Sequence, residues 1–148
     1  MTAIISTLRR DHPAYAALKY PQPLPIADLA LQPQETLVAY EVTEKETFAW
    51  FIRGKKIIEA LTIPVTRQAL TAQINQYQQF FAGICSAADL SRFDPQAGKK
   101  LYDLLLKDFA PLLQEGERLV IVPDEIIGIL PFEALVMELP AKVEIATG

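Results

Sequence analysis

Three short, largely apolar stretches lie between residues 35 and 63. The stretches 37–42, 48–52 and 57–63 are rich in β-branched and aromatic residues, and short polar segments separate them. Such runs predict strands, and connections of this length favour an antiparallel meander.

The middle stretch carries large apolar residues on both of its faces. By the two-residue period of a strand, Phe48, Trp50 and Ile52 share one face. Ala49 and Phe51 share the other. A strand that is apolar on both faces needs cover on both, so we expect helices on either side of the sheet.

Two later segments change to a helical period. The first covers residues 66–82, and the second begins at Asp94, where the aspartate can cap a helix and Pro95 can take its first position. Apolar residues recur at helical spacing in both segments: Leu70, Ile74, Tyr77 and Phe81 in the first, and Ala97, Leu101, Leu104, Leu105 and Phe109 in the second. We expect Pro111 to end or kink the second helix.

An unbroken apolar run at residues 119–122 (LVIV) is too short for a helix and is bounded by turn residues. It predicts a strand buried on both faces, as in a parallel sheet. Pro123 and Asp124 end this strand, and Pro131 opens a short helix further on. In chain order, the elements predict an α/β fold in which an antiparallel β-meander and two helices lead into the first strand of an α/β sheet.

Residues 1–34 contain five of the eleven prolines of the chain. Proline fixes its own φ and favours extended geometry in the residue before it, so we predict a proline-rich arm or linker here and no helix. The domain itself is expected over residues 35–148.

Composition narrows the possible partners. The chain has 148 residues, of which 51% are hydrophobic and 22% charged, with a net charge of −4, and this is typical of a globular domain. The densest basic cluster, Arg53, Lys55 and Lys56, is interpreted as a solvated hairpin tip, so no basic stripe favours nucleic acid as a partner. No apolar run is long enough to cross a membrane, and a single cysteine fits a cytoplasmic protein.

Candidate catalytic residues are few. His12 and Cys85 are the only histidine and cysteine, so a thiol nucleophile with an imidazole base would need this pair. No positive charge flanks Cys85 to stabilise a thiolate, and we interpret it as a small buried residue. The sequence contains no metal-ligand spacing, no glycine-rich phosphate loop and no GxSxG turn, so we expect no metal and no cofactor.

Two motifs resemble a known family. Residues 119–124 (LVIVPD) and 130–135 (LPFEAL) are similar to the signature of the CHAT domain, a caspase-like and separase-like family often found behind tetratricopeptide repeats. The resemblance implies a caspase-like sheet and, for the parent protein, a cysteine peptidase. Glu125 stands where the family usually has glycine. The catalytic histidine and cysteine motifs of the family lie on the carboxyl side of the matched segment, so this chain is expected to be an amino-terminal portion without them.

The resemblance also indicates a candidate site. In caspase-like folds the loop after the first strand approaches the substrate pocket, which makes Asp124 and Glu125 candidates for contact with a basic side chain. A structural alternative is that Asp124 caps the turn that follows it.

Three functions follow, in order of preference. The first is the non-catalytic amino-terminal scaffold segment of a CHAT-type cysteine peptidase, and the alternative is a non-enzymatic protein-interaction module. A small-molecule-binding domain is third, because no phosphate-binding glycine pattern follows the strand. The expected partner is a protein or peptide. Since residues 119–122 are expected at a sheet edge, we also expect this strand to pair with another chain, by self-association, or with the carboxyl-terminal tail of the chain.

Overall fold

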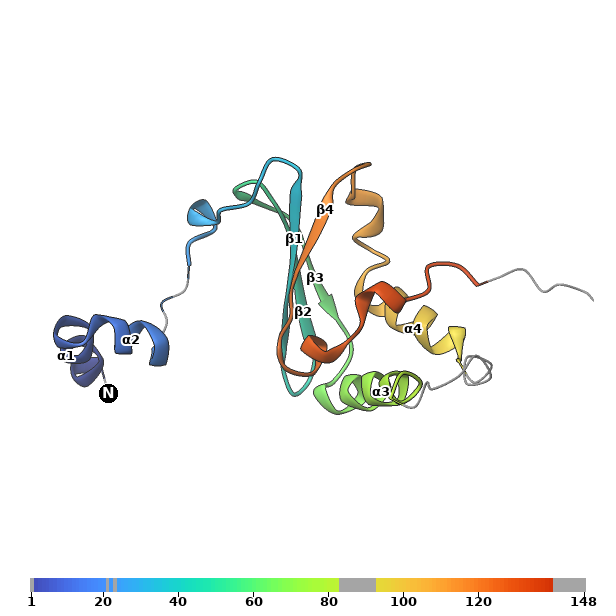
Figure 1. The fold of residues 1–148 in the computed structure, drawn as a ribbon, viewed down its shortest axis with the longest axis horizontal. Helices are drawn as coiled ribbons and strands as arrows, with labels where there is room; N and C mark the ends of the chain where they lie inside the picture. Colours follow the sequence, from blue (N-terminus) through green and yellow to red (C-terminus); the bar gives the residue numbers. More distant parts are fainter. Residues whose placement is uncertain (1, 21, 23, 83–92, 140–148) are drawn as a thin grey trace, which may run out of the picture. The chain divides into compact units, whose positions relative to one another are not determined.

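The computed structural model describes residues 2–20, 22, 24–82 and 93–139. The chain divides into two compact units, residues 1–30 and residues 31–148 (Figure 1).

The first unit contains two α-helices, α1 (Thr2–Asp11) and α2 (Pro13–Lys19), and a 3-10 turn, η1 (Ile26–Asp28). The prediction of an arm without helices is therefore wrong. Pro13 occupies the first turn of α2, where its missing N–H costs no hydrogen bond, so this proline starts a helix. The guanidinium of Arg9 donates to the carbonyl oxygen of Tyr20 and links the two helices.

A four-stranded mixed sheet forms the centre of the second unit. Its strands are β1 (Glu35–Val42), β2 (Thr47–Arg53), β3 (Lys56–Ile63) and β4 (Arg118–Val122), in the spatial order β3-β2-β1-β4. β1, β2 and β3 form the expected antiparallel meander, and β4 joins β1 in parallel (Figure 1). The predicted α/β fold is confirmed.

Two helices occupy the connection between β3 and β4, as the helical period predicts. α3 (Arg67–Gln79) begins after Thr66, whose side chain accepts a hydrogen bond from the Ala69 amide. α4 (Pro95–Leu105) begins after Asp94, whose carboxylate accepts from the Gln96 amide. α4 ends well before Pro111, which lies instead in a separate 3-10 turn, η3 (Ala110–Leu112), so Pro111 neither ends nor kinks it.

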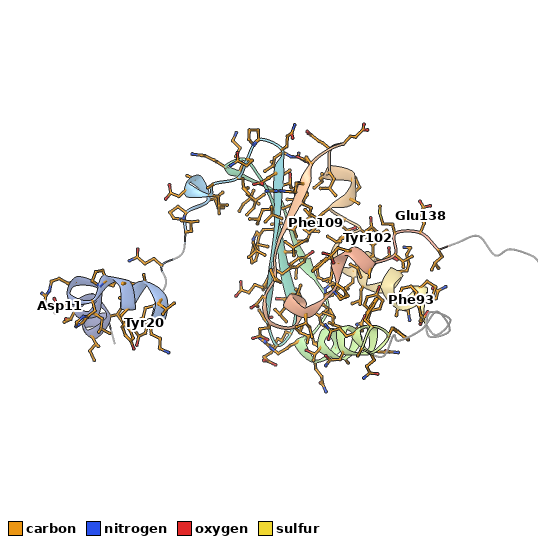
Figure 2. All side chains as sticks on the ribbon, in the orientation of Figure 1. Asp11, Tyr20, Phe93, Tyr102, Phe109 and Glu138 are labelled. Carbon is orange, nitrogen blue, oxygen red and sulfur yellow. The ribbon has the colours of Figure 1, made fainter. Side chains whose placement is uncertain are left out.

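The hydrophobic core lies between the sheet and these two helices. α3 and α4 cover the same face of the sheet (Figure 1). The core residues are Val38, Tyr40, Val42, Ala49, Phe51, Ile63, Val65, Leu70, Ile74, Tyr77, Leu101, Leu105, Phe109, Ile127 and Leu130. Phe109 stacks on Phe51 with ring centroids 5.5 Å apart, and Figure 2 shows Phe109 and Tyr102 on this helical side.

The prediction of helices on both faces is wrong for the described part of this unit. The strand register places three rows of side chains on the face away from the helices: Ile57, Ile52, Leu37 and Val120; Ala60, Trp50, Ala39 and Val122; and Thr62, Phe48 and Glu41. The first two rows are wholly apolar. The two-residue period correctly predicts which residues share this face, but it cannot say what covers it.

Candidate functional site

The loop that leaves the carboxyl end of β4 holds both candidate residues. Oδ2 of Asp124 accepts a hydrogen bond from the backbone N–H of Val42, at 2.8 Å. The Asp124 side chain makes no hydrogen bond to the turn that follows it, η4 (Glu125–Ile129). Its carboxylate therefore attaches the loop to the end of β1, and this differs from the turn-capping alternative.

Glu125 lies beside Asp124 in an uncommon backbone conformation. Its φ is +43°, in the left-handed region that glycine takes without steric cost. Its carboxylate forms an ion pair with Arg67 at the start of α3. The Arg67 guanidinium also pairs with Glu44 at 2.9 Å and donates to the Val42 carbonyl oxygen at 2.6 Å.

The carboxyl ends of β1 and β4 thus carry a mixed cluster of charges. Two carboxylates, those of Glu44 and Glu125, pair with the guanidinium of Arg67, and the Asp124 carboxylate and this guanidinium both hydrogen-bond to the backbone of Val42. Glu44 is largely exposed and Glu125 about half exposed, so negative charge is accessible at this end of the sheet. Such a cluster can attract a cationic side chain.

A second charged cluster, at the opposite end of the sheet, was not predicted. The guanidinium of Arg53 donates to both carboxylate oxygens of Glu117, at 2.6 and 2.7 Å, and the Thr36 hydroxyl donates to the same carboxylate at 2.8 Å. The Glu117 side chain is only 6% exposed. The hydrogen bonds from Arg53 lower the pKa of Glu117 to about 2.

The interpretation of Arg53 as part of a solvated hairpin tip is therefore wrong. Arg53 shares the two-residue parity of Ala49 and Phe51, which point into the core, and its guanidinium lies 5.4 Å from the centre of the Phe51 ring. This parity was visible in the sequence and indicates that Arg53 faces inward. Only the tertiary structure shows that Glu117, 64 residues away, is its partner.

The remaining candidates are the pair of Cys85 and His12, a metal site and a membrane-spanning helix. Cys85 lies outside the described residues, so its position relative to His12 is not defined. Within the described ranges, no three or more His, Cys, Asp or Glu residues are grouped to hold a metal ion. No helix in the described part of the chain is both long and apolar enough to span a membrane.

β4 is an edge strand among the described residues, because its only strand neighbour there is β1. Beside this edge, on the helical side of the sheet, lies an apolar groove of about 450 Å³. Its lining includes Tyr102, Leu106, Leu119, Phe132 and Leu135. The prediction that residues 119–122 form a strand buried on both faces is wrong, because no residue of β4 is fully buried and Val122 is 44% exposed.

Comparison of the chain with protein-family models, with curated proteins and with solved structures finds no match in any of the three.

Proposed function

We propose that this chain is a non-catalytic, amino-terminal scaffold segment of a CHAT-type cysteine peptidase, with the catalytic histidine and cysteine carried by a different segment. The observation that carries the proposal is the left-handed φ of Glu125, +43°. The family usually has glycine at this position, and glycine takes this conformation without steric cost. The loop therefore has the backbone that the family residue favours, although its own residue is glutamate.

The arrangement around the loop also supports this proposal. β4 runs parallel to β1, and the loop leaves its carboxyl end, where open α/β sheets bind their ligands. Asp124 and Glu125 then form one wall of a pocket for a basic side chain. The chain itself contributes position and charge, and it has no part in proton transfer or nucleophilic attack.

Co-expression tests the proposal. The chain is produced with the carboxyl-terminal half of a CHAT-type peptidase, which carries the histidine and cysteine motifs. We expect a stable complex that hydrolyses a fluorogenic peptide with a basic residue before the scissile bond, and that loses this activity when the catalytic cysteine of the added half is replaced. Cys85→Ser should have no effect. Cys85-dependent hydrolysis by the chain alone, or failure to form the complex, would overturn the proposal.

The variant Asp124→Asn tests whether the negative charge of Asp124 binds a basic substrate side chain in this complex. Asparagine keeps an oxygen that can accept the hydrogen bond from Val42, so the loop should remain attached. Loss of a charge-assisted hydrogen bond should lower kcat/KM for a basic substrate by roughly tenfold to a hundredfold and leave a neutral substrate almost unchanged. An equal loss for both substrates would assign Asp124 a structural role only.

The second candidate function is a protein-interaction module without any catalytic partner. The outer edge of β4, which pairs with no other strand among the described residues, favours it, since such an edge offers backbone hydrogen-bonding groups to another chain. This second function would be favoured if the chain forms no complex with the catalytic half but binds another protein.

A further inference from the structure

The two edges of the sheet differ in how they are protected. β3, at one edge, carries Lys56 and Glu59 and has a register irregularity against β2 at Phe51 and Ile52. Charges and bulges of this kind hinder pairing with another strand. β4, at the other edge, carries a charge only at its first residue, Arg118, which pairs with Glu35, and it has no proline or bulge within residues 118–122. Only the β4 edge is therefore open to pairing among the described strands.

The hydrogen bonds of β4 show which of its backbone groups face outward. The N–H of Arg118 donates to the carbonyl oxygen of Gln34, which precedes β1. Backbone groups on a strand alternate in direction, so those of Val120 and Val122 also face β1. The N–H and C=O groups of Leu119 and Ile121 then face the free edge. The next outward position is Pro123, which has no N–H to leave unpaired.

We propose that a second copy of this chain pairs with β4 along this edge, antiparallel and with the two-fold axis at Val120. Leu119 of each copy then lies opposite Ile121 of the other. Each such pair exchanges two hydrogen bonds, so all four outward-facing groups of each copy are satisfied. The two sheets become one sheet, in which both helical layers lie on the same face.

Three features favour a second copy as the occupant. The outward-facing groups at residues 119 and 121 are symmetric about Val120, so the edge is complementary to itself. In this register Arg118 lies opposite Val122 of the other copy, and no like charges face each other. The side chains of Leu119 and Ile121 lie on the helical side in both copies, and Leu119 lines the apolar groove there.

This inference is independent of the CHAT-type assignment. A chain that pairs with itself can still be a scaffold segment, and a chain that stays monomeric can still bind a catalytic half. The two proposals therefore fail separately.

A disulfide test measures the register. In a Cys85→Ser background, Val120→Cys places two cysteines opposite each other at the axis, in a pair that shares no hydrogen bonds and whose Cα atoms are about 4.5 Å apart. This spacing permits a disulfide. Val122→Cys is the matched control, since the two copies of residue 122 would lie about 13 Å apart along the strands. We expect mild oxidation to convert Val120→Cys to a covalent dimer and to leave Val122→Cys monomeric.

Charge at residue 122 gives a second test. A lysine at residue 122 of each copy would lie opposite Arg118 of the other copy, which gives two pairs of like charges in each dimer. A glutamate at residue 122 would give two pairs of opposite charges instead. We expect Val122→Lys to raise the dimer Kd by about twofold to thirtyfold and Val122→Glu to hold or lower it. A general loss of packing on this face would weaken both variants alike.

Amide exchange by NMR completes the experiment. Raising the protein concentration should slow exchange at Leu119 and Ile121, while Val120 and Val122 are protected at every concentration by β1. A monomer at all concentrations, equal cross-linking of the two cysteine variants, or the same change of Kd with lysine and glutamate would overturn the proposal.

Discussion

Glu125 holds a conformation that residues with a Cβ usually avoid. The left-handed region costs such residues roughly 1–2 kcal/mol. Its ion pair with Arg67 offsets part of this cost, but a half-exposed ion pair contributes only about 0–1 kcal/mol. The backbone strain and the ion pair each contribute little to stability. When glycine replaces Glu125, loss of the strain stabilises the fold and loss of the ion pair destabilises it.

Comparison of Glu125→Gly with Glu125→Ala separates the contribution of the backbone strain from that of the ion pair. Both variants lose the ion pair with Arg67, and only glycine relieves the strain. We expect the glycine variant to be more stable than the alanine variant by about 0.5–1 kcal/mol, measured by urea denaturation. At Gly128, which has no positive φ, alanine should be at least as stable as glycine. An alanine variant at residue 125 as stable as the glycine variant would show that the loop leaves the left-handed region.

The ion pair of Arg53 and Glu117 should make stability depend on pH. The pKa of Glu117 is about 2 in the folded chain, below its ordinary value of 4.5. The folded state therefore favours the charged carboxylate, and this contribution to stability is complete above about pH 4.5 and is lost as the pH falls towards 2.

Glu117→Gln is the matched variant for this effect. It should be less stable than the native chain near pH 7, and the difference in the free energy of unfolding should narrow as the pH falls from 6 to about 3. Denaturant unfolding at several pH values measures it. A difference that stays constant over this range would mean that Glu117 has an ordinary pKa in the folded chain.

At the scale of elements, α3 and α4 approach closely at Gly98. A Cβ at this position would lie 3.0 Å from the Tyr77 hydroxyl oxygen and 3.1 Å from a methyl group of Val136. Tyr77 is fully buried, and its hydroxyl donates to the carbonyl oxygen of Ala134, so its ring has little freedom to move. Packing against α3 therefore favours glycine at this position, although glycine has a low helix propensity.

Gly98→Ala should destabilise the fold although alanine is the better helix former. The gain in helix propensity is about 1 kcal/mol, and overpacking costs typically 1–3 kcal/mol, so we expect a net loss of up to about 2 kcal/mol. Gly128→Ala is the control, because its nearest neighbour, Pro123, is at an ordinary contact of 3.7 Å. Thermal unfolding of both variants provides the measurement. A raised melting temperature for Gly98→Ala would show that α3 and α4 separate without cost.

At the scale of the whole molecule, the net charge and the apolar β4 edge act in opposite directions on self-association. Each copy carries a net charge of −4, so two copies repel each other at low salt. The proposed contact itself is made of backbone hydrogen bonds and apolar side chains, which salt does not screen.

Dimerisation through β4 should therefore withstand salt. Between about 50 and 500 mM NaCl at pH 7, we expect the dimer Kd to fall or to change by less than about threefold, because salt screens only the repulsion. Sedimentation velocity across this range measures it. A dimer that dissociates as salt is added would depend on contacts between opposite charges, and the β4 edge would then not be its interface.

Local patterns in the sequence determined most of the elements of the second unit. The meander, the helix cap at Asp94 and the strand at residues 119–122 follow from short-range effects: side-chain period, turn residues and capping. The first unit shows where such reasoning fails. Pro13 belongs to a cluster that favours extended chain, yet it starts α2, because a proline at the first turn loses no hydrogen bond.

The tertiary structure alone decided which distant residues meet. Asp124 was recognised as a candidate from its place after a strand, but its partner, the Val42 amide, lies 82 residues away. The same holds for Arg53 with Glu117, and for the placement of both helices on one face of the sheet. The physical reason is that the period of a strand or helix determines only which side chains share a face. The element that covers that face is selected by packing and charge pairing across the whole fold.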